Sequence, residues 1–179
     1  MKLIAFLRGL RLNARAVTMA YLQTAFEAEG FERVEVFLAT GNVVFDGDAE
    51  DIGGLEVAID AMLVDALGFE VTTFIRTDAE VRAIAHHKAF MPALIKTAAA
   101  YNVAMFRGEL DAAAKETVLT FRTPGEDLQV HGREIYWLSG KKPGESEISN
   151  AVFELAVGRP STLRGVKTMR EIARRYPPR

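Results

Sequence analysis

The sequence predicts an α+β fold of two βαββαβ units, the second degenerate, followed by a C-terminal helix. Three observations predict it. Short β-rich runs and amphipathic helical segments alternate as strand, helix, strand, strand, helix, strand over residues 1–76. Weaker signals of the same order return after residue 100. The last residues have the apolar spacing of one more helix.

The first strand and the first helix follow from simple patterns. Residues 3–7 are a continuous apolar run ending at Arg8-Gly9, which is typical of a central strand buried on both faces. Thr18 is a suitable N-cap, and Gly30 can end the helix in the left-handed conformation. We therefore expect a strand, a polar loop and a helix over residues 1–30.

A hairpin, a second helix and a fourth strand complete the first unit. Thr40-Gly41-Asn42 is a tight-turn signal between two β-rich runs, and Gly68 is a helix stop. The expected segments are strands at 34–38, 43–45 and 69–76 and a helix at 55–66. This order is the ferredoxin-like split arrangement.

The second half repeats the order more weakly. Thr77-Asp78-Ala79-Glu80 is a capping box that starts a helix near residue 78, and residues 86–99 carry no clear pattern. The expected segments are strands at 101–106, 128–130, 134–138 and 161–163 and helices at 111–119, 148–157 and 168–176. We therefore expect a ferredoxin-like subdomain at 1–77, a helical connector at 78–99, and a second ferredoxin-like subdomain with the C-terminal helix at 100–179.

The composition excludes several kinds of functional site. The chain has 179 residues, of which 49% are hydrophobic and 26% charged, as in globular proteins. It has no cysteine, which excludes disulfides and zinc–thiolate sites. Its three histidines are scattered, so we expect no metal, and without a dinucleotide fingerprint we expect no cofactor. No signal-peptide or membrane-span pattern is present, which predicts a cytoplasmic protein without membrane contact.

Several short strings carry a resemblance to a known family. In chain order they are Leu7-Arg8-Gly9-Leu10, Thr40-Gly41-Asn42-Val43-Val44-Phe45, Ile75-Arg76-Thr77, Gly132-Arg133-Glu134-Ile135-Tyr136 and Thr162-x-Arg164-x-x-x-Thr168. Over nearly the whole chain they resemble the uncharacterised bacterial family known as domain of unknown function 1697. The resemblance implies two ferredoxin-like subdomains and no established activity.

A candidate ligand site follows from the expected topology. In a βαββαβ unit the first and third strands are antiparallel neighbours, so Arg8-Gly9 should lie beside Gly41-Asn42. Guanidinium, hydroxyl and amide groups near a helix start suit a phosphate or carboxylate. The expected ligand-binding residues are Arg8, Arg11, Asn13, Thr40 and Asn42. Alternatively, the glycines serve turns and the Asn42 side chain caps the hairpin.

Two loops resemble ligand loops but lack required residues. Residues 139–146 have no Gly-Lys-Ser/Thr at the Walker A spacing, which predicts an ordinary loop with Ser146 capping the next helix. Residues 46–51 lack the EF-hand glycine and the matching glutamate.

Three functions remain open. The first is the binding of a small anionic ligand at the Arg8 rim, with no identified catalytic residue. The second is binding of RNA or single-stranded nucleic acid, for which Phe6 and Phe45 would have to stack on bases and the basic tail at 159–179, with a net charge of +6, would contact phosphates. The third is an interaction module, a monomer or a homodimer joined through a free sheet face or edge.

Overall fold

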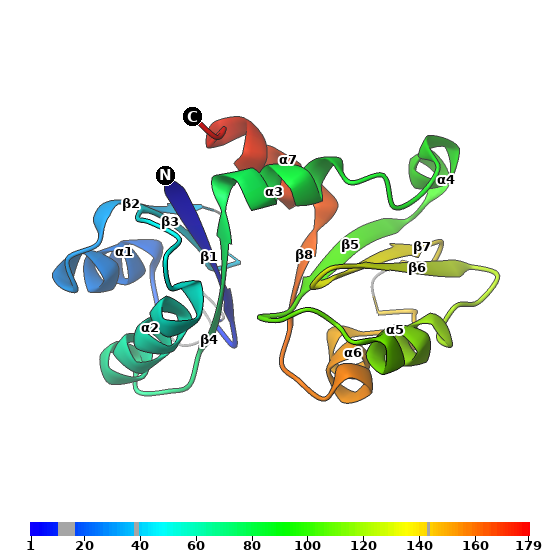
Figure 1. Cartoon of the computed structure of the whole chain (residues 1–179), viewed down its shortest axis with the longest axis horizontal. Coiled ribbons are helices and arrows are strands. Elements are labelled where there is room, and N and C mark those ends of the chain that lie inside the picture. Colours follow the sequence, from blue (N-terminus) through cyan, green and yellow to red (C-terminus); the bar gives the residue numbers. More distant parts are fainter. Residues whose placement is uncertain (11–16, 38–39, 143) are drawn as a thin grey trace. The chain divides into compact units, whose positions relative to one another are not determined.

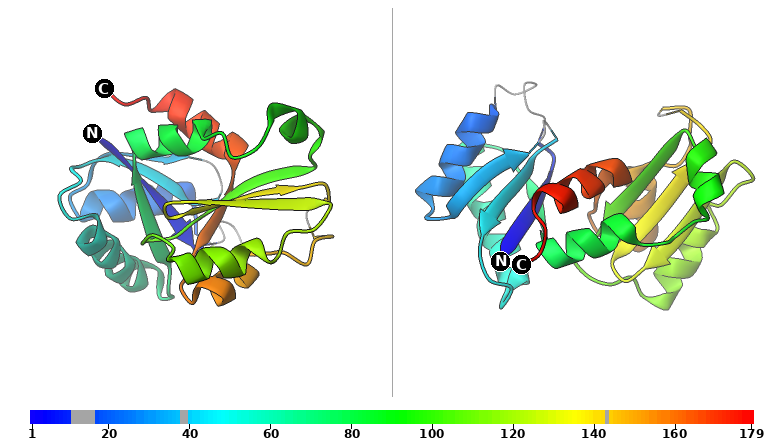
Figure 2. Two further views of the ribbon diagram at one scale, coloured as in Figure 1. Left: turned by 45° about the vertical axis from the view of Figure 1, so that its right-hand side comes forward. Right: turned by 90° about the horizontal axis from the view of Figure 1, so that it is seen from above.

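The computed structural model describes residues 1–10, 17–37, 40–142 and 144–179. The chain divides into two compact units, Met1–Ala83 with Ile172–Arg179, and Ile84–Glu171. Each unit has a four-stranded antiparallel sheet with two helices on one face (Figures 1 and 2). The predicted α+β fold of two ferredoxin-like subdomains with a C-terminal helix is confirmed. The subdomain boundaries expected at residues 77 and 99 stay a prediction.

The first unit has the strand order β2-β3-β1-β4. Strands β1 and β3 are antiparallel neighbours with Phe6 opposite Asn42, so the expected pairing of the first and third strands is confirmed. The elements are β1 (Lys2–Arg8), α1 (Met19–Ala28), β2 (Glu32–Phe37), β3 (Asn42–Asp46), α2 (Ile52–Leu67) and β4 (Thr72–Thr77), followed by α3 (Asp78–His86), which runs into the second unit.

Local side-chain and backbone signals set the helix ends in this unit. The Thr18 hydroxyl accepts a hydrogen bond from the Tyr21 amide at 3.0 Å, and Gly68 ends α2 with φ 77°. The capping box is present in full: the Glu80 amide donates to Thr77 Oγ1 at 3.1 Å, and the Thr77 amide donates to Glu80 Oε2 at 2.9 Å. The Thr18 cap, the Gly68 helix end and the Thr77–Glu80 capping box could be predicted because each depends only on residues close together in the sequence.

The second unit repeats this arrangement with the order β6-β7-β5-β8. Its elements are α4 (Pro92–Thr97), β5 (Ala100–Met105), α5 (Ala112–Leu119), β6 (Glu126–His131), β7 (Glu134–Ser139), α6 (Asn150–Val157), β8 (Thr162–Gly165) and α7 (Val166–Arg175), whose last turn belongs to the first unit. Helix α4 lies in the stretch that carried no clear pattern. The expected Ser146 cap is wrong: Ser149 caps α6, while the Ser146 hydroxyl donates to Glu126.

Both faces of the first sheet are buried. Leu3, Ala5 and Leu7 of β1 belong to the core shared with α1 and α2, together with Phe45 of β3. Phe6 is on the opposite face by strand alternation and is also fully buried. The aromatic rings that base stacking would use are therefore inside the protein.

The C-terminal residues contribute to the cover of that second face. The Tyr176 hydroxyl donates to Glu35 Oε2 at 2.7 Å, and the Arg175 guanidinium donates to the same oxygen at 3.0 Å. The Tyr176 ring lies edge-on to Phe37, with centroids 6.2 Å apart. The apolar residues of this face, Ile4, Phe6, Val44 and Phe74, are all 0% exposed.

In both units, polar side chains of a helix form hydrogen bonds with main-chain groups at the corresponding edge strand. In the first, Glu56 and Asp60, one turn apart on α2, accept from the amides of Ile75 and Thr73 on β4, at 2.8 and 2.7 Å. In the second, Asn150 and Glu154 of α6 bind the carbonyl and amide of Ser161, at 2.9 and 3.0 Å, next to β8. These hydrogen bonds occupy main-chain groups with which another strand could pair.

Within the described part of the chain, no helix has the length and apolar character needed to cross a membrane.

Candidate functional site

Two glycine turns bring the end of β1 beside the start of β3. The Leu7 amide donates to the Gly41 carbonyl at 2.9 Å. Gly9 and Gly41 have φ of 88° and 76°, which favour glycine. A Cβ on Gly41 would lie 3.0 Å from Leu10 Cδ2, so the Gly41 turn packs closely against the Leu10 side chain. The rim predicted from the topology is therefore formed.

Asn42 organises this rim from the inside. Its side chain is 0% exposed, and Nδ2 donates to the Phe37 carbonyl and to Thr40 Oγ1, both at 2.9 Å. These bonds close the β2–β3 turn, as in the alternative interpretation of this residue. In this structure the Asn42 amide positions Thr40, and a direct contact of Asn42 with a ligand stays a prediction.

The remaining expected site residues divide into two groups. Arg8 is half-buried at the end of β1, and Thr40 is exposed on the facing turn. Arg11 and Asn13 lie outside the described residues. Of the five residues expected from the sequence, the structure thus brings Arg8, Thr40 and Asn42 to one end of the sheet.

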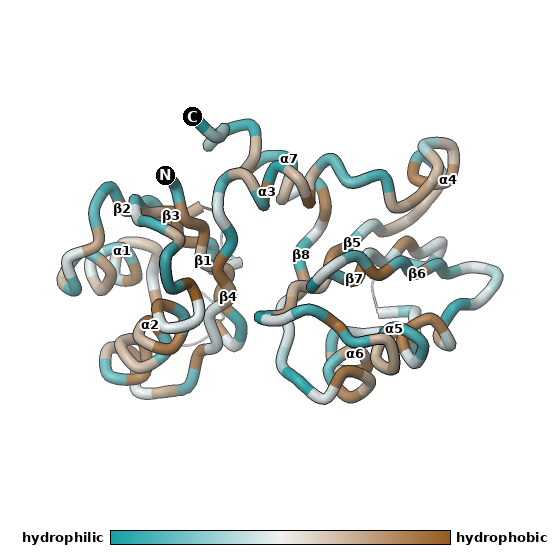
Figure 3. Tube along the Cα trace, viewed as in Figure 1, coloured by the Kyte–Doolittle hydropathy of each residue, from teal (hydrophilic) through white to brown (hydrophobic). Residues whose placement is uncertain are grey.

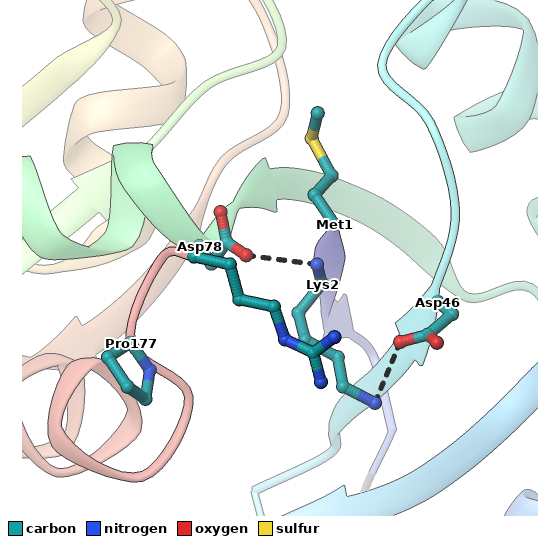
Figure 4. Close-up of a pocket in the computed structure, with 6 residues that line it drawn as sticks. Met1, Lys2, Asp46, Asp78 and Pro177 are labelled. Atoms are coloured by element: carbon teal, nitrogen blue, oxygen red, sulfur yellow. Dashed lines mark hydrogen bonds and ion pairs between the residues drawn. The ribbon is translucent and has the colours of Figure 1, made fainter.

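A small pocket lies at the opposite end of β1 (Figure 4). It has a volume of about 70 Å³ and is lined by Met1, Lys2, Asp46, Asp78, Pro177 and Arg179. The Lys2 ammonium is 2.8 Å from Asp46 Oδ1, and the Lys2 amide donates to Asp78 Oδ2 at 3.0 Å. The hydrogen bond from Lys2 lowers the pKa of the Asp46 carboxyl. The Lys2–Asp46 ion pair and the bond from the Lys2 amide to Asp78 hold the start of β1 in place, which indicates a structural role.

A family model described as protein of unknown function (DUF1697) matches residues 1–136. The chain belongs to this family. The resemblance to this family is thereby confirmed over residues 1–136, and the string at residues 162–168 lies beyond the match.

Among solved structures, this DUF1697 protein is similar to the conserved bacterial protein SP0830 from Streptococcus pneumoniae. The two share 20% sequence identity with a TM-score of 0.74, and the match covers 98% of this chain and 97% of the other. At this identity the likeness shows the fold. The comparison with curated proteins gave no match.

The second unit of the DUF1697 protein contains a buried carboxylate that the sequence did not reveal. Glu126 is 3% exposed; it accepts from the Trp137 indole at 3.1 Å and from the Ser146 hydroxyl at 2.7 and 2.8 Å. The Lys141 ammonium is 3.6 Å away. The one signal in the sequence was Trp137, because a buried indole N–H requires an acceptor. Glu126 ties the loop after β7 to the sheet.

The DUF1697 protein also brings two of its histidines together. The rings of His87 and His131 are stacked with centroids 4.4 Å apart, and the Tyr136 ring is 4.7 Å from that of His87. Among the described residues no group of three or more potential metal ligands is present. Burial lowers the pKa of His87, and the neighbouring His131 lowers it further.

We expect this stack to make stability depend on pH. Because the pKa of His87 in the folded state is below 6.5, the unfolded chain takes up the proton first as the pH falls. The stability contribution of neutral His87 is therefore complete above pH 6.5 and decreases as the pH falls through its folded pKa. Urea unfolding across this range should show a smaller decrease for His87→Gln. Equal pH dependence in both proteins would contradict the assignment.

Proposed function

We propose that this DUF1697 protein binds a small anionic ligand, bearing phosphate or carboxylate, at the rim where β1 ends and β3 begins. Arg8 would supply the guanidinium and Thr40 the hydroxyl, two groups suited to an anion. Arg11 and Asn13, expected from the sequence to belong to the same site, would add a second guanidinium and an amide.

The observation that carries this proposal is the rigid placement of Thr40. The Asn42 amide holds Thr40 Oγ1 at 2.9 Å, and the Leu7–Gly41 hydrogen bond holds the same turn against the end of β1. A polar side chain fixed in this way loses little conformational entropy when a ligand arrives. The Asn42 bonds that close the turn thus also hold the exposed Thr40 hydroxyl in place.

Nucleic-acid binding has less support. Phe6 and Phe45 are fully buried, and much of the basic tail is engaged within the chain. Arg164 is buried, while Arg159, Arg170 and Arg175 donate hydrogen bonds to Glu109, Ala85 and Glu35, respectively.

Calorimetric titration of the full chain with inorganic phosphate, ribose 5-phosphate and citrate tests the proposal. We expect Arg8→Ala to weaken binding by about tenfold to a hundredfold, because a hydrogen bond from a charged donor contributes about 1.5–3 kcal/mol. Arg82→Ala is the matched control: it removes the same charge on α3, which follows β4 at the other end of the sheet.

Two results would overturn the proposal. One is unchanged affinity in a folded Arg8→Ala protein. The other is the absence of heat with every probe at concentrations where an anion site of ordinary affinity saturates.

A further inference from the structure

A pocket of about 420 Å³ lies at one corner of the second unit. It is bounded by α4, by the turn that leads into β6 and by the end of β7. Figure 1 shows α4 on the side of this sheet opposite α5 and α6. Pockets that bind small molecules have volumes of about 300–1,000 Å³ and combine apolar walls with a few fixed polar groups. This pocket has the volume of a small-molecule site.

One wall of the pocket is apolar. It is formed by Leu94 and Ala98 at α4, Leu138 of β7 and Pro124 of the turn. Leu94 is 50% exposed, whereas Leu138 is 7% exposed. Figure 3 shows α4 mainly in brown tones. An aliphatic or aromatic group of a ligand would be removed from water against this wall, which favours binding.

A pair of opposite charges lies beside the apolar wall. Arg122 and Asp127 both line the pocket, with side chains 40% and 45% exposed, and Arg122 Nε is 3.0 Å from Asp127 Oδ1. Asp127 is opposite Leu138 in the pairing of β6 with β7, so these two side chains are neighbours on one face of the sheet. The pocket therefore presents charged groups and apolar surface together.

Hydrogen bonds to one main-chain residue hold this ion pair in place. Arg122 Nε and Nη2 donate to the Leu128 carbonyl at 2.9 and 2.6 Å, and Asp127 Oδ1 accepts from the Leu128 amide at 2.8 Å. These bonds leave Arg122 Nη1 and Asp127 Oδ2 without a hydrogen-bond partner among the residues that the structure describes. A charged donor and a charged acceptor that are already ordered thus remain for a ligand, which reduces the entropy that binding costs.

The third charged residue of the lining is already used within the protein. Glu126 is 3% exposed and accepts from the Trp137 indole and the Ser146 hydroxyl, and the Lys141 ammonium is 3.6 Å away. The charge offered to a ligand is therefore that of the ion pair, one positive and one negative. A ligand with a single charge would face a like charge beside its partner, which is costly, whereas a ligand with both charges can satisfy both.

We infer that this pocket binds a free α-amino acid with an apolar side chain. The α-carboxylate accepts from Arg122 Nη1 and the α-ammonium donates to Asp127 Oδ2. The side chain of the ligand lies against Leu94 and Leu138. In an amino acid one carbon joins the two charged groups, so they are close enough to pair with two side chains that contact each other. This site is independent of the anion site proposed at the Arg8 rim in the other unit.

Calorimetric titration of the full chain with L-leucine, L-phenylalanine and L-methionine tests the inference. Three analogues each lack one feature of L-leucine: N-acetyl-L-leucine lacks the ammonium, L-leucinamide lacks the carboxylate, and glycine lacks the apolar side chain. We expect each analogue to bind at least about tenfold more weakly than L-leucine, because each loses one of the three contacts.

Two substitutions test the pocket residues directly. Asp127→Asn keeps an acceptor for the Leu128 amide; it should weaken L-leucine binding by at least about tenfold without weakening that of N-acetyl-L-leucine. Glu116→Gln is the matched control, because it removes a charge from an exposed residue of α5 outside the pocket. Leu94→Ser should also weaken L-leucine binding, and its control is Leu155→Ser, at a residue of α6 that is 86% exposed.

Four results would overturn the inference. The first is the absence of heat with all three amino acids at concentrations that saturate a millimolar site, and the second is equal affinity for L-leucine and N-acetyl-L-leucine. The third is unchanged L-leucine affinity in a folded Asp127→Asn protein. The fourth is loss of L-leucine binding in Arg8→Ala, which would place the amino acid at the rim. Unchanged L-leucine affinity in Arg8→Ala, together with loss of phosphate binding, would show that the two sites are separate.

Discussion

Replacing Phe45 by alanine is expected to destabilise the protein by about 4 kcal/mol, near the middle of the range for a buried phenylalanine. Phe45 is 0% exposed. Its ring centroid is 4.8 Å from that of Phe31 and 5.8 Å from that of Phe26. The substitution removes the ring that joins β3 to α1 and leaves a cavity. Urea unfolding followed by far-ultraviolet circular dichroism measures the loss.

Phe45→Leu is the control for this prediction. Leucine fills most of the same space, so we expect it to cost less than half as much. A Phe45→Ala protein within about 1 kcal/mol of the parent would place the ring outside the core. That result would return Phe45 to consideration as a ring available for base stacking.

Glu126→Ala is expected to cost about 3 kcal/mol, because it removes the acceptor of the buried Trp137 indole and of the half-buried Ser146 hydroxyl together. The Trp137 indole and the Ser146 hydroxyl would lose the carboxylate that now lies 2.7 to 3.1 Å away, and the Lys141 ammonium would lose its nearby charge. A buried donor left without an acceptor costs about 1–3 kcal/mol. Fluorescence of Trp137, the single tryptophan, follows both the unfolding and the changed surroundings of the indole.

Two variants separate this network from a general effect of charge. Glu126→Gln keeps one acceptor oxygen and should fall between the parent and alanine. Glu145→Ala removes an exposed carboxylate that accepts from the Lys142 amide at 3.2 Å, so we expect a change below about 0.5 kcal/mol. If Glu126→Ala and Glu145→Ala lower the free energy of unfolding equally, the hydrogen bonds of Glu126 contribute no more to stability than those of an exposed carboxylate.

Only part of the candidate site could be predicted from the sequence. The pairing of β1 with β3 follows from the order of the elements, and from that pairing the sequence predicts Arg8 beside Thr40 and Asn42. The sequence left two directions open for the Asn42 side chain, toward a ligand or into the turn that it caps. The direction depends on the position of the Phe37 carbonyl across the turn, which the closed hairpin sets.

The sequence by itself determined the elements and their order, because caps, turn residues and apolar spacing act between neighbours in the chain. Thr18, Gly68 and the Thr77–Glu80 box illustrate this. The tertiary structure alone decided which polar groups became buried and paired. Glu56 with Ile75 and Glu126 with Ser146 are 19 and 20 residues apart, and no local pattern distinguishes these glutamates from exposed ones. Burial depends on what packs against a residue, and only the complete fold sets that.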